Sequence, residues 1–321
     1  MVPGSPRSAR RRHGLAPAAL LALLASFTGT TGLAGERTVG GTATADAVEF
    51  LRLSRDDAGE LVSLDTSIVE YAEDPRDAAR AGRPPVSVDL VAAVHVGGDA
   101  YYETLDRLFT EYDAVLYELV ARPDERPRPG RKPAGAIGSA QQGLKRLLGL
   151  EFQLESIDYT AANFVHADLS PKEFQQAMKK RGESWWGMFT KLMRESMERA
   201  ERGEADVPEI GIGELLGLLF GGGPERQVRL RRLMAEQFTD MDVLTSAFGG
   251  EEGSTLITDR NAAALRVLRR QIAKGDRRIA IFYGAAHMDD FDRRLQDDFG
   301  LQPGETIWLE AWDLRDAPPR K

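Results

Sequence analysis

The chain has 321 residues and no cysteine. Disulfide frameworks, thiolate metal sites and cysteine nucleophiles are therefore all excluded. Histidine is also scarce, with four in the whole sequence. One of these, His13, lies in a predicted leader, so imidazole chemistry in the mature chain can involve only His95, His166 and His287.

The common signatures of nucleotide binding and of serine hydrolysis are missing. Gly211, Gly213 and Gly217 have the wrong spacing for a phosphate loop or a dinucleotide fingerprint. There is also no G-x-S-x-G elbow, the turn that presents a catalytic serine in many hydrolases. These absences favour neither a nucleotide-dependent enzyme nor a serine hydrolase.

The chain carries more negative than positive charge. The formal net charge is −8, and it becomes −12 when the four arginines of the predicted leader, which has no acidic residue, are removed. Binding to phosphate backbones needs a basic surface. We therefore predict that the protein has no nucleic-acid partner.

Residues 1–34 have the three parts of a signal peptide. Arg7 and Arg10–Arg12 are basic, Leu15–Phe27 is apolar, and Gly32-Leu33-Ala34 forms a small-residue cleavage site. The apolar run is short for a membrane span. We expect an exported protein, periplasmic or secreted, with no stable membrane span after leader removal; a leader kept as an anchor is the alternative.

Residues 35–321 are predicted to form a single α/β domain, because short apolar runs alternate with amphipathic segments. The expected architecture is a central, mostly parallel mixed sheet flanked by helices. The predicted strands are 48–53, 60–68, 88–94, 114–120, 279–283 and 306–312. The predicted helices include 99–112, 134–150 and 256–273, and residues 74–85 are predicted to be a loop. The region about 170–250 is almost wholly helical in pattern, opens with the capping box Ser170-Pro171-Lys172-Glu173, and is predicted to be an inserted helical cap over the strand ends.

Two predicted strands end in a histidine. Val88–Val94 is followed at once by His95, and Ile279–Tyr283 leads through Gly284-Ala285-Ala286 to His287. Open α/β sheets bind ligands at the carboxyl ends of their strands. We therefore expect these two imidazoles to face a shared pocket.

Glu118 interrupts the apolar run 114–120. A carboxylate in a core strand is costly unless it is paired or binds a metal. Its place one crossover after His95 favours a site residue. The alternative is a structural partner for a buried arginine.

Arg260 belongs to the run Asp259-Arg260-Asn261, near the start of the helix that precedes His287. It is assigned to stabilising a developing oxyanion or orienting a substrate carboxylate, or alternatively to an ordinary salt bridge with a nearby acid. Asp259 and Asn261 are placed at the rim of the site. His166, just ahead of the capping box, is assigned either to the same rim or to a hydrogen bond within a loop.

The motifs that carry these residues resemble a known family. Its signature is two G-x-x-H motifs, with a glutamate after the first and an acidic-Arg-Asn/Asp helix start before the second. The matching segments here are Ala92-Ala93-Val94-His95, Glu118 within LYEL, Asp259-Arg260-Asn261 and Gly284-Ala285-Ala286-His287. Over residues 86–312 their order and spacing are similar to those of the TraB/PrgY/GumN family, which includes the animal Tiki proteins. Ala92 stands where that family usually has glycine.

The resemblance implies a fold like that of the erythromycin esterase and ChaN group, with a central sheet, helices on both faces and a helical cap. Tiki proteins are metal-dependent proteases that favour manganese or cobalt. The PrgY and TraB members instead lower the activity of peptide pheromones. The resemblance therefore extends to fold and site more than to substrate.

These observations predict a metal-dependent hydrolase, peptidase-like, that acts on a peptide or a small amide or ester. His95 and His287 would hold one divalent ion, with Glu118 as the third ligand or as general base. Such nitrogen and oxygen ligands suit Mn, Co, Fe or Zn and do not choose among them. One alternative is a non-catalytic peptide-sequestering protein of the pheromone-shutdown type. A weaker one is a haem- or iron-binding protein.

Overall fold

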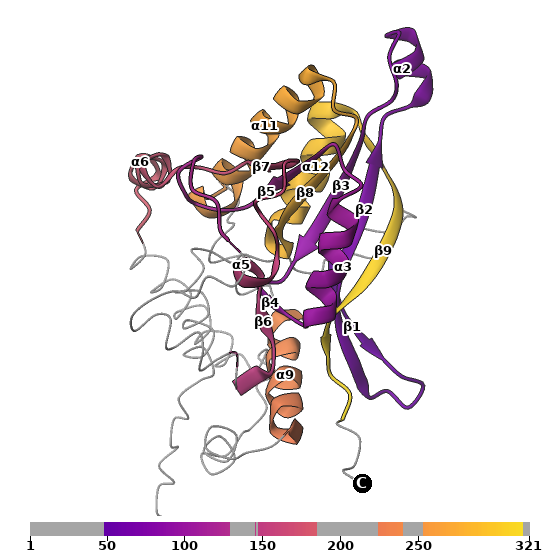
Figure 1. Cartoon of the computed structure of the whole chain (residues 1–321), viewed down its shortest axis with the longest axis vertical. Helices are drawn as coiled ribbons and strands as arrows, with labels where there is room; N and C mark the ends of the chain where they lie inside the picture. The colour runs from indigo at the N-terminus through magenta and orange to yellow at the C-terminus, as the bar shows by residue number, and fades with distance from the viewer. Residues whose placement is uncertain (1–47, 129–144, 146, 185–223, 240–252, 317–321) are drawn as a thin grey trace, which may run out of the picture.

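The computed structural model describes residues 48–128, 145, 147–184, 224–239 and 253–316. Its centre is a seven-stranded mixed sheet in the order β1-β2-β3-β8-β5-β7, with β9 paired to the other edge of β2 (Figure 1). Four strands run parallel: β3 (Ser87–Ala93), β8 (Arg278–Gly284), β5 (Ala114–Tyr117) and β7 (Phe164–His166). The other three pair antiparallel: β1 (Leu51–Arg55), β2 (Leu61–Ala72) and β9 (Gln302–Asp313). The predicted α/β class with a mixed, mostly parallel sheet is confirmed.

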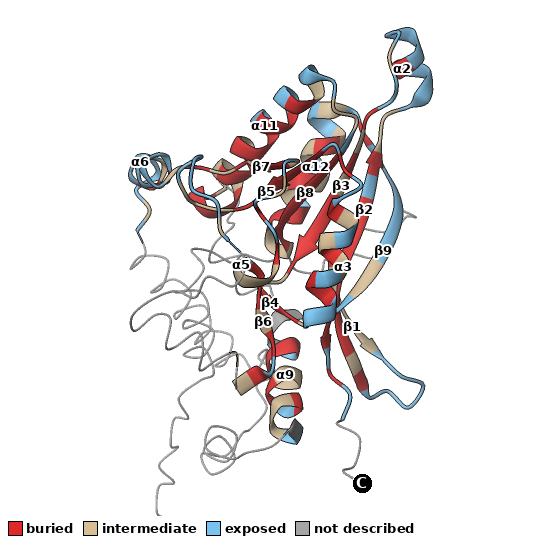
Figure 2. Cartoon of the chain, in the orientation of Figure 1, coloured by how far each residue is buried: buried red, intermediate tan, exposed pale blue. Residues whose placement is uncertain are grey.

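Helices cover both faces of the sheet. Helix α3 (Asp99–Phe109) packs on one face, and α11 (Arg260–Lys274) and α12 (Met288–Phe299) pack on the other (Figure 1). Side chains of β8 alternate between the two cores, with Phe282 on the α3 side and Ile281 on the α11 side. A strand buried on both faces needs apolar residues at every position. This explains the continuous apolar run in its sequence and the buried centre seen in Figure 2.

Parallel pairing brings the carboxyl ends of four strands to one edge. Ala93, the last residue of β3, lies opposite Gly284, the last residue of β8. Tyr117, the last residue of β5, lies opposite Phe282 on one side and His166 on the other. The residues that directly follow these strand ends are therefore neighbours in space.

Some local predictions are wrong. The predicted loop 74–85 contains helix α2 (Pro75–Arg80), because Asp74 caps it by accepting a hydrogen bond from the Arg76 amide and Pro75 is tolerated in its first turn. The strand predicted for 114–120 ends at Tyr117, so Glu118 follows the strand instead of lying inside it. A short π-helical turn, η1 (Thr255–Asp259), precedes α11 where one continuous helix was predicted.

The predicted cap, about 170–250, is described only in part. Helix α6 (Pro171–Arg181) begins at the predicted capping box, where the Ser170 hydroxyl accepts from the Glu173 amide. Helix α9 (Pro224–Thr239) is the other described segment. The rest of the predicted cap, the leader 1–34 and most of the predicted helix 134–150 lie outside the described residues, so these predictions stay predictions.

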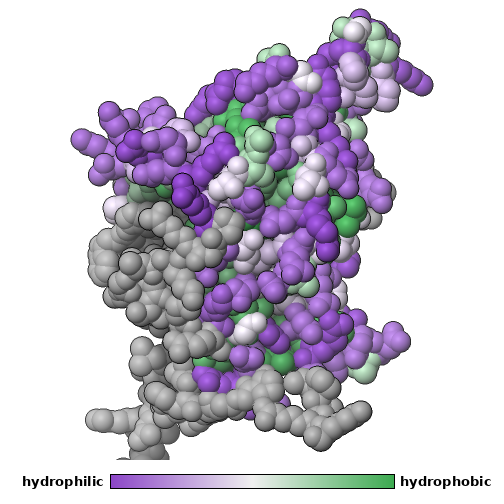
Figure 3. Space-filling model, in the orientation of Figure 1, coloured by the Kyte–Doolittle hydropathy of each residue, from purple (hydrophilic) through white to green (hydrophobic). Residues whose placement is uncertain are grey.

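The face of the molecule seen in Figure 3 is largely hydrophilic, with small, separate hydrophobic patches. Within the ranges that the structure describes, we find no helix with the length and apolar character needed to cross a bilayer.

Candidate functional site

Glu118 is fixed by the pairing of β5 with β8. Its own backbone N–H donates to the carbonyl of Phe282 at 3.2 Å, which extends the ladder by one residue. Its side-chain Oε2 accepts from the backbone N–H of Gly284 at 2.7 Å. Only 6% of Glu118 is exposed. The carboxylate is thus held over the end of β8 by main-chain contacts.

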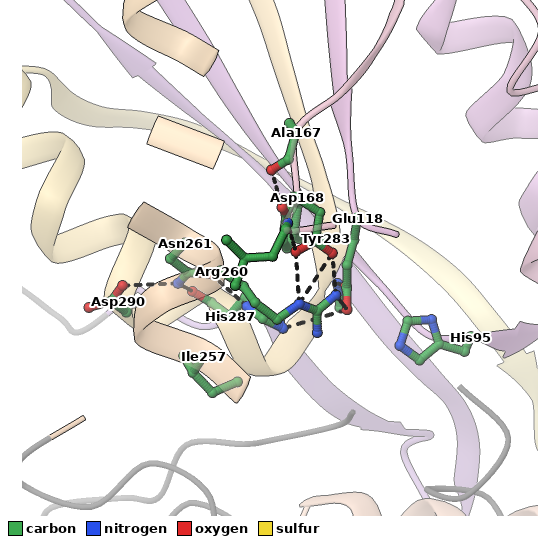
Figure 4. A network of polar contacts seen from close by, with 12 residues as sticks. His95, Glu118, Ala167, Asp168, Ile257, Arg260, Asn261, Tyr283, His287 and Asp290 are labelled. Carbon is green, nitrogen blue, oxygen red and sulfur yellow. Dashed lines mark hydrogen bonds and ion pairs between the residues drawn. The ribbon is translucent and has the colours of Figure 1, made fainter. Parts of the chain in front are cut away.

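The two strand-end histidines meet Glu118 around Gly284. His287 Nε2 lies 3.6 Å from Glu118 Oε1. A Cβ atom added at Gly284 would be 3.3 Å from Glu118 Oε2 and 3.4 Å from His95 Nε2, so both groups lie directly against this glycine. Figure 4 shows His95, Glu118 and His287 at the same edge of the sheet. The structure brings together the three residues that the sequence singled out.

Arg260 is buried between two carboxylates (Figure 4). Its Nη2 lies 2.8 Å from Glu118 Oε1 and also contacts Asp168 Oδ2, while its Nε donates to Asp168 Oδ1 at 3.0 Å. The salt-bridge alternative for Arg260 and the buried-arginine alternative for Glu118 are therefore the geometry observed. They are compatible with a site role, because the same pairing orients Glu118.

Asp168 is a site residue that the sequence analysis missed. Its side chain is completely buried, and it follows β7 by two residues. Tyr283 supports this turn from β8, since its hydroxyl donates to the carbonyl of Ala167 at 2.5 Å. The only signal in the sequence was an acid within a mostly apolar stretch, FVHADL, with no spacing that linked it to Arg260.

Asn261 determines which nitrogen of His287 carries the proton. The Asn261 Nδ2 donates to the carbonyl of His287 and to Asp290 Oδ2, both at 3.0 Å, so its Oδ1 must face the imidazole. His287 Nδ1 lies 2.5 Å from that oxygen and therefore donates to it. The Nε2 atom is left with its lone pair. It is buried and has no hydrogen-bond partner among the described residues.

The charges of the site follow from burial and from its ion pairs. Burial alone would raise the pKa of Glu118, but Arg260, His287 and His95 together lower it to about 2. Burial lowers the pKa of His287 to about 4, although the nearby carboxylate of Glu118 raises it. Burial also disfavours the charge on Arg260, but Asp168 and Glu118 outweigh it and raise its pKa above the ordinary value. Near neutral pH the site therefore holds a carboxylate, a neutral imidazole and a guanidinium.

The three residues predicted for the rim are placed differently. His166 Nε2 hydrogen-bonds with the carbonyl of Leu119 at 2.7 Å, which matches the structural alternative for this residue. Asp259 accepts two hydrogen bonds from Arg181 and so ties η1 to α6. Asn261 is fully buried behind His287, so the prediction that it forms a rim is wrong, although it contacts the site directly.

An open cavity of about 730 Å³ lies beside the carboxyl end of β5. Its lining begins at Leu119, the residue after Glu118, and includes residues 124–128 and Thr160. The volume lies within the range of small-ligand sites. Its lining residues do not include His95, Glu118 or His287.

The donor atoms fit a divalent ion in kind. Two imidazole nitrogens and a carboxylate are common ligands of first-row metals, and the orphaned Nε2 of His287 is in the form that binds metal. These side chains do not form a complete metal centre in the structure. Within the described ranges, no group of three or more His, Asp or Glu side chains is arranged to hold a metal ion.

Comparisons of the chain with protein-family models, curated proteins and solved structures give no match.

Stability should depend on pH through His287. Its pKa is lowered from 6.5 to about 4 on folding, so the unfolded chain takes up a proton that the native state refuses within that window. The stabilisation is complete above the unfolded pKa and is lost as the pH falls through the folded one. Between pH 6.5 and about 4 the wild type should lose ~3 kcal/mol of unfolding free energy through this residue, at about 1.4 kcal/mol per pKa unit, and His287→Gln should not show this loss. Chemical denaturation across this pH range, with chelator present, measures it, and parallel curves for the two proteins would contradict it.

Gly284 should not tolerate a side chain. Gly284→Ala places a methyl group 3.3 Å from Glu118 Oε2, so the carboxylate must move by a few tenths of an ångström, while His95 Nε2, at 3.4 Å, is at the limit of ordinary contact. We expect the free energy of unfolding to fall by about 1–3 kcal/mol. Gly98→Ala is the matched control, because its Cβ would meet only the carbonyl of Ala311, at 3.5 Å. Equal losses in the two variants would show that the contact around Gly284 is not tight.

Proposed function

We propose that this chain is a metal-dependent hydrolase that cleaves a peptide or a small amide or ester, with a divalent ion held by His95, Glu118 and His287. One observation carries the proposal. A buried imidazole nitrogen with a free lone pair, His287 Nε2, faces the carboxylate of Glu118 at 3.6 Å. Arg260 already pairs with the Oε1 atom of Glu118 at 2.8 Å, and a divalent ion beside Nε2 would bind on the imidazole side of the same carboxylate.

The pKa of Glu118 favours one of its two predicted roles. A general base works best when its pKa lies near the working pH. At about 2, the carboxylate of Glu118 is a weak proton acceptor but a permanent negative charge. This supports the ligand role over the general-base role.

Arg260 and Asp168 keep Glu118 ready for that role. Arg260 holds the carboxylate ionised and aimed, and Asp168 fixes the guanidinium from its other side. A bound divalent ion would supply a water molecule acidic enough to act as hydroxide near neutral pH. The neutral His287 would bind it without adding charge, and His95 would supply the second imidazole. Direct stabilisation of an oxyanion by Arg260 stays a prediction.

The substrate class rests on the resemblance to Tiki proteins, which suggests a peptide, or a small amide or ester.

Export remains part of the proposal through the leader 1–34. Amino-terminal sequencing of the protein recovered from outside the cytoplasm tests it, since a mature chain starting near residue 35 is expected.

Metal-stimulated turnover should depend on Glu118. Mature protein stripped with chelator is given Mn²⁺, Co²⁺, Fe²⁺ or Zn²⁺ and mixed with a peptide library, and products are read by mass spectrometry. Glu118→Gln should lower turnover by at least about 100-fold, because it removes a ligand charge. Glu111→Gln is the control, since Glu111 is exposed and pairs with Arg278 at the opposite end of β8.

The same experiment separates the alternatives. Undiminished turnover in Glu118→Gln would refute the assigned role of this residue. Stoichiometric peptide retention without product, with any of the metals, would indicate a sequestering protein. An intense visible absorption band in the purified wild-type protein would indicate haem instead.

A further inference from the structure

The side of His95 that faces away from Glu118 is held by a glutamine. Gln153 is buried, and its Oε1 lies 3.1 Å from His95 Nδ1. Its backbone N–H also donates to the carbonyl of His95 at 3.0 Å. Two short strands, β4 (Val96–Gly97) and β6 (Glu151–Phe152), pair directly beside these contacts. The start of α5 (Gln153–Ser156) is thus joined to His95 through both main chain and side chain.

A buried tyrosine holds the other end of the same amide. Gln153 Nε2 donates to the hydroxyl of Tyr159 at 2.8 Å. Tyr159 is fully buried, and burial raises the pKa of its phenol, so the hydroxyl stays protonated. The amide nitrogen faces the Tyr159 hydroxyl, and the amide oxygen faces His95.

This orientation has a consequence for the imidazole. A carbonyl oxygen only accepts hydrogen bonds, so the nitrogen facing it, Nδ1 of His95, must carry the proton. The lone pair then lies on Nε2, the atom that lies against Gly284 beside Glu118. If the amide were reversed, its nitrogen would face Nδ1 and drive the proton to Nε2.

We propose that Gln153, held by Tyr159, is a positioning residue that selects the tautomer of His95 with a free Nε2. Both act through the hydrogen bond from His95 to Gln153, in the way that outer hydrogen bonds orient metal-binding imidazoles. The tautomer itself does not depend on the proposed function; only its effect on metal binding rests on that proposal.

The structure supplies a matched pair of tyrosines for the test. The rings of Tyr117 and Tyr159 pack edge-on, 5.0 Å apart between centroids, in the same buried cluster. The Tyr117 hydroxyl has no hydrogen-bond partner among the described residues, whereas the Tyr159 hydroxyl accepts from Gln153. Tyr159→Phe and Tyr117→Phe therefore make the same chemical change, but only the first one removes a contact with Gln153.

The readout is ¹⁵N NMR of histidine side chains in mature, chelator-treated protein labelled at histidine. The mature chain holds only three histidines, and the signals of His95 are assigned by their loss in His95→Gln. Measurements are made at about pH 8.5, above the ordinary imidazole pKa, where the ring is neutral and its tautomer is resolved. We expect the wild-type ring to be protonated at Nδ1 with a bare Nε2.

Gln153→Met keeps the length of the side chain but removes the acceptor, so most of the Nδ1–H population should be lost. Gln153→Glu keeps an acceptor facing the ring and should restore the Nδ1–H form.

Tyr159→Phe leaves the amide N–H without its acceptor, and an unpaired buried N–H is disfavoured more than an unpaired carbonyl. The amide should therefore reverse, and His95 should shift at least partly to the Nε2–H form. Tyr117→Phe should leave the spectrum of the wild type unchanged.

Two results would overturn the proposal. If Gln153→Met folds and His95 stays protonated at Nδ1, Gln153 does not select the tautomer. If Tyr159→Phe and Tyr117→Phe give the same His95 spectrum, Tyr159 has no part in it. The second comparison remains decisive even where Gln153→Met fails to fold.

Metal titration adds a readout for the function. With Mn²⁺ or Zn²⁺ alone as the probe, Gln153→Met should bind about 10–100-fold more weakly than the wild type, and Gln153→Glu should recover much of the loss. If the wild type binds neither metal, the proposed function fails while the NMR result still decides the role of Gln153. If the tautomer shifts without any change in affinity, the link between Gln153 and the site is wrong.

Discussion

The buried guanidinium of Arg260 is the constraint on which the site depends. A charge taken out of water costs several kcal/mol unless it is paired and hydrogen-bonded. Arg260 is paired with two carboxylates, those of Glu118 and Asp168, which offset this cost and come from separate strand ends. Its two ion pairs therefore tie the end of β5 and the turn after β7 to the start of α11.

The sheet makes this arrangement possible. Glu118 follows β5 and Asp168 follows β7, and the parallel pairing of these strands brings the two acids to one edge of the sheet. Arg260, at the start of α11, lies between them. Gly284 ends β8 at the same level and offers its amide to Glu118. A glycine at this point lets the carboxylate and His95 approach the backbone closely. The ends of β5, β7 and β8 therefore position the acids, and α11 supplies the guanidinium that pairs with them.

The sequence was sufficient for the outline of this arrangement. Strands buried on both faces leave continuous apolar runs, so β3 and β8 were predictable, and with them the histidines that follow. Glu118 was found because a charge beside an apolar run is unusual. The bounds of helices were less predictable: η1 interrupts a helical pattern without any proline or glycine within it. Apolar periodicity does not distinguish one kind of helical turn from another.

The sequence did not show which residues form hydrogen bonds and ion pairs with these side chains. Asp168 meets Arg260 across 92 positions, and Gln153 meets His95 across 58. Neither spacing has a local pattern, because both contacts come from how β7 and β6 join the sheets. β7 itself is only three residues long, too short for a period to show. Charge pairing predicted that a buried arginine and a buried acid would need partners, but not which ones.

Hydrogen bonding separates the three histidines that the sequence could not rank. His95 and His287 each present Nδ1 to a side-chain amide oxygen, Gln153 in one case and Asn261 in the other. His166 instead uses Nε2, which bonds to the backbone carbonyl of Leu119. An imidazole whose Nε2 donates to a carbonyl has no lone pair left on that atom for a ligand. In His287 the opposite nitrogen, Nε2, lies 3.6 Å from Glu118 Oε1, and in His95 it lies against Gly284. The two amides are carried on different elements, α5 and α11, so two separate segments of the chain orient the imidazoles beside Glu118.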